Sequence, residues 1–359
     1  MKKLLMVTLA LAALLAGLAV WAYAISPVRP VAWQPPAMVS LAGSYSPNDK
    51  LSAAQRISLG LGPEDVTQGP DGRLYTGLLD GRILSFSVGG DAVEIANTGG
   101  RPLGLAFDRQ GQLIVADADK GLLAIDPAGN VRVLVDAYKG HKLLFVDDLD
   151  IAADGAIWFS DASMRFGVHD AMYDFLEASA TGRLFRHDPA SGATTLMMDE
   201  LFFANGVALG PQDQYVLVTE TGAARIQRLW LRGPQQGQRD VFVDGLPGMP
   251  DNLSFNGRDT FWVALPATRG SPLESIADKP WLRRLLGGLP ASWLTPPAPQ
   301  AFVIGLSLDG QPVHNLQWQD GDLHTITSVN EIDGALHLGT IATPYVGILD
   351  VPDTAQETE

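Results

Sequence analysis

The sequence predicts an all-β protein: a six-bladed β-propeller preceded by one N-terminal transmembrane or signal helix. A short pattern of strand, glycine turn and strand recurs six times along the chain. Its early copies are spaced by about 40 to 45 residues, as propeller blades are. Beyond the N-terminal segment no 3.6-residue apolar period is sustained. Short antiparallel strands repeated in this way are typical of a propeller, in which each copy forms one blade.

The N-terminus is a long apolar segment. Two lysines precede the run Leu4–Ile25, and about 20 apolar residues suffice to cross a ~30 Å hydrocarbon layer as a helix. Ala22–Ala24 resembles a signal-peptidase site, although the run is long for the ~7–15 apolar residues of a signal peptide. Residues 1–25 are therefore either a retained membrane anchor or a cleaved signal peptide. In both cases the lysines stay inside, and the rest of the chain is expected to face the periplasm or the exterior.

The remaining chain divides by composition. Four prolines between residues 26 and 40 predict a stiff, extended spacer. The propeller is expected at residues 41–352, and a polar, frayed tail at residues 353–359. A hydrophobic content of 46% with 18% charged residues indicates that a domain of this length has an ample core.

The copy at Phe145–Asp161 shows the repeat most clearly. Its Asp154–Gly155 pair separates two β-prone segments, which is a strong signal for a hairpin. The first copy contains two such segments in direct succession, Asp71–Gly77 and Asp80–Phe86. In the later copies the repeat begins at Leu105, Leu149, Gly206, Leu253 and Val329. Each copy is therefore expected to form one blade.

Two insertions interrupt the repeats. The first, at about 164–181, contains a short amphipathic stretch with Met172, Phe175 and Leu176. The second, at about 266–300, is rich in proline and glycine around the segment Trp281–Leu286. This segment is interpreted as a helical flap that packs on its own propeller. The alternatives are a substrate lid and a membrane-surface contact, because tryptophan, leucine and paired arginine are typical of an interfacial helix.

The net charge of −15 and the lack of cysteine exclude several kinds of partner and of reactive site. Nucleic-acid binding needs clustered lysine and arginine, which this sequence does not supply, so no nucleic-acid partner is expected. Without cysteine there is no disulfide, thiol nucleophile or thiolate metal site. A cation or an uncharged small molecule suits this acidic chain better.

Oxygen-bearing side chains stand just before or at the start of the inner strand in four copies. They are Glu64, Asp147, Asn205, Asp251 and Asn252. The inner strands of a propeller converge on a central channel, so these side chains can meet although they are far apart in sequence. Calcium accepts about six to eight oxygen ligands, carboxamides included, whereas zinc prefers histidine or cysteine. The five residues therefore predict a calcium ring. The alternative is that each of them only caps its own turn.

From Gly60 to Asp350 the chain also resembles a known family. The matching segments follow one another as Gly100–Leu105, Asp148–Asp150, Thr181–Leu184, Phe203–Leu209, Pro250–Asn252, Phe261–Ala264 and Val346–Leu349. They are similar to the strictosidine-synthase-like, adipocyte plasma membrane-associated protein-like branch of the gluconolactonase–paraoxonase superfamily. The N-terminal helix is similar to that of the membrane-associated members. The resemblance implies a calcium-dependent six-bladed propeller.

The resemblance also implies functional residues. Calcium ligands of the paraoxonase type fall on the five residues named above, with Asp147 where relatives usually have asparagine. This extra negative charge favours a divalent cation. The glutamate that catalyses the strictosidine condensation falls at Thr327, so that reaction is not expected. The histidine of the paraoxonase dyad falls near Leu103, so that route to a general base is missing.

The leading functional hypothesis is a membrane-tethered, calcium-dependent hydrolase that acts on a small-molecule ester or lactone, of the arylesterase or lactonase type. Calcium would polarise the carbonyl, Asp251 would accept the proton of the attacking water, and Asp147 is the second candidate for a catalytic role. One alternative is a non-catalytic propeller that calcium stabilises and that serves as a binding module at the membrane. A metal-free enzyme is the other.

Overall fold

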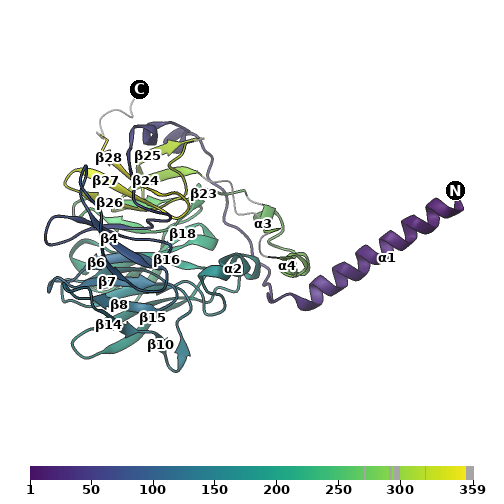
Figure 1. Ribbon diagram of the computed structural model, residues 1–359, viewed down its shortest axis with the longest axis horizontal. Coiled ribbons are helices and arrows are strands. Elements are labelled where there is room, and N and C mark those ends of the chain that lie inside the picture. The colour runs from purple at the N-terminus through teal and green to yellow at the C-terminus, as the bar shows by residue number, and fades with distance from the viewer. Residues whose placement is uncertain (271, 291–292, 295–299, 320, 353–359) are drawn as a thin grey trace.

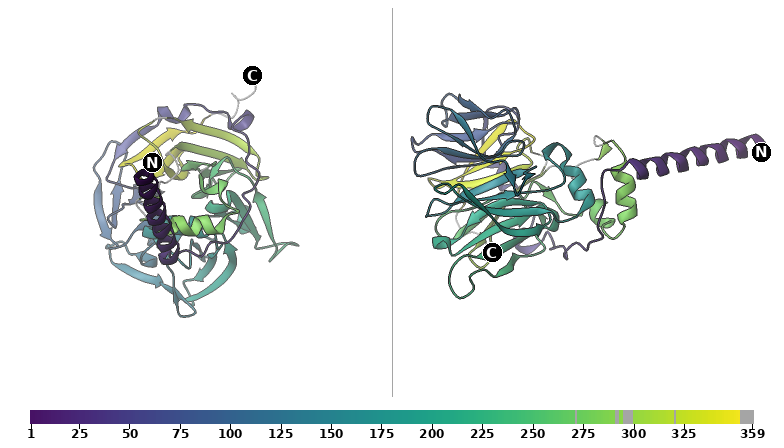
Figure 2. Two further views of the ribbon diagram at one scale, coloured as in Figure 1. Left: turned by 90° about the vertical axis from the view of Figure 1, so that its right-hand side faces the viewer. Right: turned by 90° about the horizontal axis from the view of Figure 1, so that it is seen from below.

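The computed structural model describes residues 1–359 except 271, 291–292, 295–299, 320 and 353–359. Within these residues six four-stranded antiparallel sheets surround a central axis, and one long helix extends away from them (Figures 1 and 2). The predicted six-bladed propeller is confirmed. The polar tail predicted at residues 353–359 lies outside the described residues.

The first three blades are each built from consecutive strands, innermost first. Blade one contains β2 (Val66–Gln68), β3 (Leu74–Gly77), β4 (Arg82–Phe86) and β5 (Val93–Asn97). Blade two contains β6 (Pro102–Phe107), β7 (Leu113–Asp117), β8 (Gly121–Ile125) and β9 (Val131–Val135). Blade three contains β12 (Val146–Ile151), β13 (Ile157–Asp161), β14 (Gly182–Asp188) and β15 (Ala193–Leu201). A small hairpin of β10 (Ala137–Tyr138) and β11 (His141–Lys142) precedes blade three.

The other three blades depart from this simple order. Blade four contains β16 (Ala204–Leu209), β17 (Tyr215–Glu220), β18 (Arg225–Trp230) and β19 (Arg239–Val243). Blade five contains β21 (Leu253–Phe255), β22 (Thr260–Ala264), β24 (Ala301–Ser307) and β25 (Pro312–Trp318). Between β22 and β24 the second insertion leaves the sheet, and its β23 (Ala267–Thr268) pairs with β20 (Gly248–Met249). Short 3-10 turns occur at Gly43–Tyr45, Lys50–Ala53, Val168–Asp170, Pro211–Asp213 and Thr221–Ala223.

Blade six joins the two ends of the propeller. It contains β26 (Ile326–Ile332), β27 (Ala335–Thr340), β28 (Tyr345–Asp350) and, outermost, β1 (Gln55–Ser58). The edge strand β1 runs antiparallel to β28, with Gln55 opposite Ile348 and Ser58 opposite Tyr345. Since β1 comes from the opposite end of the domain, its backbone hydrogen bonds close the ring and cover an edge that would otherwise stay unpaired.

The core lies between neighbouring blades. One apolar cluster joins Leu217 of blade four to Phe261 and Phe302 of blade five, and another joins Trp262 of blade five to Leu336 of blade six. Middle strands such as β7 and β13 are buried along their whole length because a blade covers each of their faces. This explains why their sequences read as continuous apolar runs rather than as alternating ones.

The predicted hairpin of blade three is confirmed. Asp154 and Gly155 connect β12 to β13, and Gly155 has a φ of +86°, which the tight turn requires and a glycine adopts readily. The Asp154 carboxylate accepts a hydrogen bond from the Ala156 backbone N–H (3.0 Å). The turn therefore fixes the register of the two strands.

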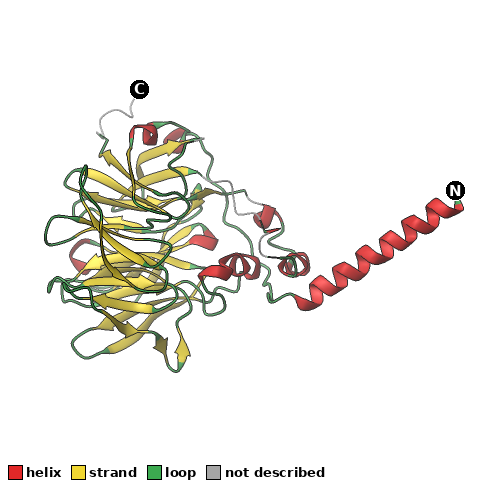
Figure 3. Cartoon of the chain, viewed as in Figure 1, coloured by secondary structure: helices red, strands yellow, loops and turns green. Residues whose placement is uncertain are grey.

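Helices gather on one face of the propeller (Figure 3). The first insertion forms α2 (Ala171–Glu177), and the second forms α3 (Pro272–Ser275) and α4 (Pro280–Gly287). We call these three helices the cap. Phe175 of α2 stacks on Phe203 of the propeller, with 4.6 Å between ring centres. The helix expected at Trp281–Leu286 forms as α4, which packs mainly on α2 and on the N-terminal helix.

The helix α1 (Lys2–Ile25) is long and apolar enough to cross a membrane, and its apolar stretch is not buried in the protein. A signal sequence near an N-terminus meets the same criteria, so both alternatives stay open. The proline-rich spacer after α1 packs against the cap. Val28 is fully buried, and the Val31 N–H donates to Glu177 O (2.9 Å).

A buried arginine holds the cap together. Arg283 of α4 has 0% of its surface exposed, although arginine is rarely buried without a partner. Its guanidinium donates to Leu176 O (3.0 Å) and Ala277 O (2.9 Å), and also to Val31 O. These carbonyls belong to α2, to the loop before α4 and to the spacer. One side chain therefore satisfies backbone groups from three segments of the cap.

Asp174 of α2 is a buried acid in the same region. It is 1% exposed, and it accepts a hydrogen bond from the Ser163 hydroxyl. Burial raises the pKa of Asp174 from 3.8 to about 7. Because the folded pKa exceeds the unfolded one, the folded protein binds the additional proton. The contribution of Asp174 to stability is therefore most favourable below about pH 4 and is lost as the pH rises through about 7.

Replacing this acid by its amide should remove that pH dependence. Asp174→Asn is expected to match the parent near pH 4 and to be more stable near pH 8, by an amount on the order of a few kcal/mol. Thermal unfolding of both proteins across this range measures the difference. Asp154→Asn is the control, since a hydrogen bond from Ala156 lowers the pKa of Asp154 and the range lies above it. A constant difference between Asp174→Asn and the parent would contradict the argument.

Candidate metal centre

The predicted site residues lie where the inner strands begin. In blade three Val146, at the start of β12, pairs with Asp161, at the end of β13, from which the first insertion departs. In blade five the Asp251 N–H donates to Ala264 O (2.9 Å), just before the second insertion. The strand starts and the cap are therefore at the same face of the propeller.

Local irregularities turn these residues toward the channel. The pairing of β12 with β13 shifts register between Val146 and Leu149, and that of β16 with β17 between Ala204 and Val207. Such β-bulges bend a strand and change the direction of its side chains. The shifts enclose Asp147 in one blade and Asn205 in another. Comparable shifts occur at the starts of β6 and β26.

Blade four approaches blade five closely at this point. A Cβ atom on Gly206 would lie 2.6 Å from Asn252 Cα and 2.6 Å from Asp251 O, so no larger residue fits. Just before it, Phe203 has a φ of +60°, which is uncommon for a bulky residue and is held by the packing around it. This close contact brings Asn205 next to Asp251.

The five predicted ligands lie together, four of them buried and Asp251 partly exposed, and direct hydrogen bonds join two pairs of them. Asn252 Nδ2 donates to Glu64 Oε1 (3.2 Å), and the Asn205 side chain is hydrogen-bonded to the Asp251 carboxylate. Asp147 lies close enough to Asp251 and Glu64 for their charges to interact. Residues from blades one, three, four and five thus face one another in the channel.

The carboxylates of this ring are costly to ionise. Burial raises the pKa of Glu64 well above its usual value, and repulsion from Asp251 and Asp147 raises it further. Burial, followed by repulsion from Asp251, does the same for the pKa of Asp147. Burial raises the pKa of Asp251 to about 7, although its hydrogen bond with Asn205 acts in the opposite direction. A nearby cation would favour the ionised forms and so offset the cost of burying them.

Four oxygens of the ring have no hydrogen-bond partner among the described residues. They are Glu64 Oε2, Asp147 Oδ2, Asn205 Oδ1 and Asn252 Oδ1. Buried polar atoms normally have a partner, so a group of four calls for an explanation. Turn-capping aspartates such as Asp108 do bond their own backbone, at 2.9 Å to the Gln110 N–H. The unpaired oxygens therefore fit a ring of hard ligands better than a set of turn caps.

The arrangement is not that of an acid-only or histidine site. Within the described residues, no three or more His, Cys, Asp or Glu side chains form a group that could hold a metal ion by themselves. Two of the five donors here are carboxamides. Calcium accepts such mixed oxygen sets and flexible geometry. The residues present therefore fit calcium, whose ligands in this chain remain a prediction.

A second set of aspartates faces the neighbouring blades instead. Asp65 Oδ2 accepts from the Leu105 N–H of blade two (3.0 Å), and Asp148 Oδ2 accepts from the Val207 N–H of blade four (2.7 Å). Of the adjacent acids Asp147 and Asp148, only the first thus belongs to the ring. The second set lines a cavity of about 200 Å³ in the channel, where inner-strand residues of every blade meet.

The sequence did not point to Arg101, which lies directly before β6. It is 2% exposed, its Nη1 donates to Gly62 O (2.9 Å), and its Nη2 has no partner among the described residues. Its charge lowers the pKa of both Glu64 and Asp147. Its position in the repeat could have identified it, because Arg101 precedes the inner strand of its copy as the ring residues do.

The family resemblance implies that Thr327 and Leu103 stand at positions where relatives have catalytic residues. The Thr327 hydroxyl donates to Glu64 O (3.0 Å), and its side chain is buried. Leu103 is also buried and belongs to the apolar cluster beneath the cap. Neither side chain can act as an acid or base near neutral pH.

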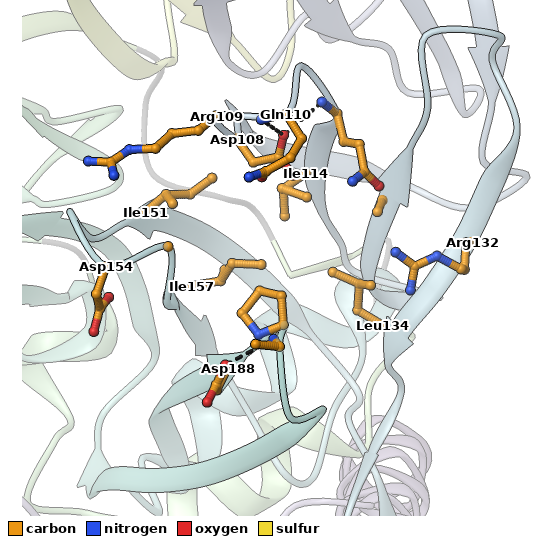
Figure 4. A pocket seen from close by; sticks show the side chains of 15 residues that line it. Asp108, Arg109, Gln110, Ile114, Arg132, Leu134, Ile151, Asp154, Ile157 and Asp188 are labelled. Atoms are coloured by element: carbon orange, nitrogen blue, oxygen red, sulfur yellow. Dashed lines mark hydrogen bonds between the residues drawn. The ribbon is translucent and has the colours of Figure 1, made fainter.

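Further cavities lie outside the ring. One, of about 450 Å³, is lined by residues of blades two and three (Figure 4). Its Asp108 and Asp188 already accept hydrogen bonds from their own turns. A smaller one, of about 60 Å³, lies between the cap, the spacer and blade four. Its wall is mainly apolar and includes Trp33, Met172, Phe175, Phe202, Met249 and Leu273.

Sequence comparison identifies relatives of the whole chain. Family models for strictosidine synthase and for the strictosidine synthase-like N-terminal region match residues 147–234 and 43–86. The adipocyte plasma membrane-associated protein of Salmo salar is 35% identical over 97% of this chain and 90% of its own length. Protein strictosidine synthase-like 10 of Arabidopsis thaliana is 37% identical over 81% of this chain and 85% of its own.

Solved structures share the fold at lower identity. A gluconolactonase from Xanthomonas campestris has a TM-score of 0.62 at 20% identity, and the match covers 90% of this chain and 97% of that one. A calcium-binding regucalcin from Agrobacterium tumefaciens has a TM-score of 0.58 at 15% identity, over 82% and 90% of the two chains. As its motifs predicted, the chain belongs to the strictosidine synthase-like family, and it shares the propeller fold of the gluconolactonase.

Proposed function

We propose that this protein is a membrane-tethered, calcium-dependent hydrolase of esters or lactones. The observation that carries the proposal is the ring in the channel: four blades contribute five donor residues, of which four are buried, and four of their oxygens lack a partner among the described residues. The names of the structural neighbours, a gluconolactonase and a calcium-binding regucalcin, support a lactonase-type superfamily with calcium sites. The particular activity of this chain is our inference.

Each residue of the ring has a role in this proposal. Glu64, Asn205, Asp251, Asn252 and Asp147 would hold the ion. Bound there, calcium would polarise the carbonyl of an ester or lactone. Asp251, whose carboxylate is hydrogen-bonded to Asn205 within the ring, is the first candidate to accept the proton of an attacking water, and Asp147 is the second candidate. Thr327 lacks the carboxylate that strictosidine condensation needs, so we do not propose that reaction.

The small cavity beneath the cap supports an apolar substrate. Met249 and Phe202 line it, and they lie two and three residues before the ring residues Asp251 and Asn205. An apolar wall beside a few polar groups is typical of a small-molecule site. An aryl or alkyl group of the substrate would therefore lie under the cap, with its ester bond toward the ring.

The N-terminal helix and the membrane-associated relatives support anchoring to a membrane. Lys2 and Lys3 precede the apolar run, and positive residues stay on the inner side. We therefore place the propeller on the periplasmic or exterior side.

Activity should depend on both the ion and Asp251. Asp251→Ala and, separately, a calcium chelator are expected to abolish hydrolysis of a panel of aryl esters and lactones, because general-base help is typically worth about 10²–10⁴ in rate. Added calcium should restore the chelated parent but not the variant. Asp244→Ala, which removes an exposed carboxylate outside the ring, is the control and should keep full activity.

Other outcomes distinguish the alternatives. Hydrolysis that survives both chelator and Asp251→Ala would exclude the metal mechanism. Calcium binding without turnover on any member of the panel would favour the non-catalytic binding module.

Calcium binding should depend on the carboxamides as well as on the acids. Asn205→Leu keeps the side-chain volume but removes the unpaired oxygen, and we expect calcium affinity to fall at least about tenfold. Titration calorimetry on the full-length chain measures this. Asn97→Leu, at an exposed turn of blade one, should bind calcium as the parent does. Equal affinity in the parent and Asn205→Leu would remove Asn205 from the ligand set.

The positive charge of Arg101 is expected to weaken calcium binding. Its positive charge acts on Glu64 and Asp147, so Arg101→Met is expected to strengthen calcium binding several-fold, whereas Arg101→Lys should change it little. The same calorimetric titration separates the two variants. Unchanged or weaker binding in a folded Arg101→Met protein would show that the guanidinium supports the site rather than competing with the ion.

A further inference from the structure

The helix α4 packs against the end of the apolar helix α1. A Cβ atom on Gly288, directly after α4, would overlap Ala22 O, so the two backbones are in contact. The Arg284 guanidinium lies over the Tyr23 ring, 4.7 Å from its centre. The cap is thus joined directly to the last turn of α1, on the side from which α1 leaves the protein (Figures 1 and 2).

The side chains of α4 are arranged in the opposite way to those of a helix that faces water. Its charged Arg283 points inward and is bound to backbone carbonyls, whereas Trp281 is 60% exposed. A helix of a globular protein that faces water normally buries its large apolar side chains and exposes its charged ones. The pattern of α4 indicates that its outer side does not face bulk water.

The exposed tryptophan lies on the side of α4 that faces α1. Trp281, Arg284 and Gly288 are separated by three and four residues, so they share one face of the helix. Two of them contact α1. Since α1 is the candidate membrane span, the face that bears Trp281 points toward the layer that α1 would enter.

The chemistry of this region suits the lipid headgroup layer. Trp21 and Tyr23 at the end of α1 are exposed, and so are Trp281 and Trp293 of the second insertion. Tryptophan and tyrosine collect at membrane interfaces because their rings are apolar with one polar edge. Arg284, whose side chain is partly exposed, supplies a cation for lipid phosphate.

We propose that the cap rests on the bilayer that α1 spans, with Trp281 inserted at the headgroup level. The membrane is then a docking partner of the folded domain as well as the attachment point of its N-terminus. The cap also covers the start of the inner strands, so this face of the propeller is held next to the lipid. The inference rests on the membrane anchor of the proposed function and does not depend on the proposed hydrolysis.

The lack of cysteine allows a direct test on the full-length chain. A nitroxide label is attached to Trp281→Cys in nanodiscs of phosphatidylcholine and phosphatidylglycerol. Its collision rates with oxygen, which enters lipid, and with a water-soluble nickel complex are compared by electron paramagnetic resonance. The control label at Gln110→Cys lies in the exposed turn between β6 and β7, at the end of β6 away from Arg101. We expect the oxygen-to-nickel ratio to be several-fold higher at 281 than at 110.

The other outcomes overturn the proposal. Equal ratios at the two positions would show that α4 faces water. Dipolar broadening between labels at 281 would show that a second copy of the chain covers it instead. Since Trp281 is exposed, its replacement leaves the core intact, and the melting temperature of each labelled protein verifies folding. A further variant, Arg284→Glu, should lower the ratio at 281 if lipid phosphate contributes, and an unchanged ratio would remove that contribution.

Discussion

The structure depends on three carboxylates that share one buried channel. Glu64, Asp147 and Asp251 come from different blades. Burial raises the pKa of all three, and repulsion between the carboxylates raises those of Glu64 and Asp147 further. Such a ring costs stability unless a positive charge accompanies it. Arg101 supplies part of that charge, and a divalent cation would supply the rest. The free-energy cost of burying these carboxylates at the centre of the fold is consistent with a functional site there.

The propeller supplies the rigidity that such a ring needs. Its first and last strands, β1 and β28, pair with each other, so no blade can move away without breaking the closed circle. Aspartates such as Asp65 and Asp148 bind backbone N–H groups of the next blade and fix the spacing of the inner strands. The cap then covers the same face. Stability is thus concentrated around the channel, while the irregular residues of the site are confined to bulges.

Sequence patterns predicted the repeated elements well, because a strand, a glycine turn and an apolar period are local properties. The Asp154–Gly155 hairpin and the helix containing Phe175 were found in this way. The pairing of β1 with β28 was not, since its partners are almost 300 residues apart, as Gln55 and Ile348 are. Arg101 was not predicted because its role depends on the bulged strands around it. The packing of the spacer against the cap was not predicted because prolines predict an extended chain but not what that chain contacts.

The central claim is that oxygen atoms from separate blades coordinate one divalent ion. The most direct measurement is an anomalous-scattering map of crystals of the full-length protein grown with calcium. The account predicts one peak in the channel, at about 2.3–2.6 Å from oxygens of Glu64, Asn205 and Asp251. A channel without a peak in calcium-saturated crystals, or an ion bound only elsewhere, would contradict it.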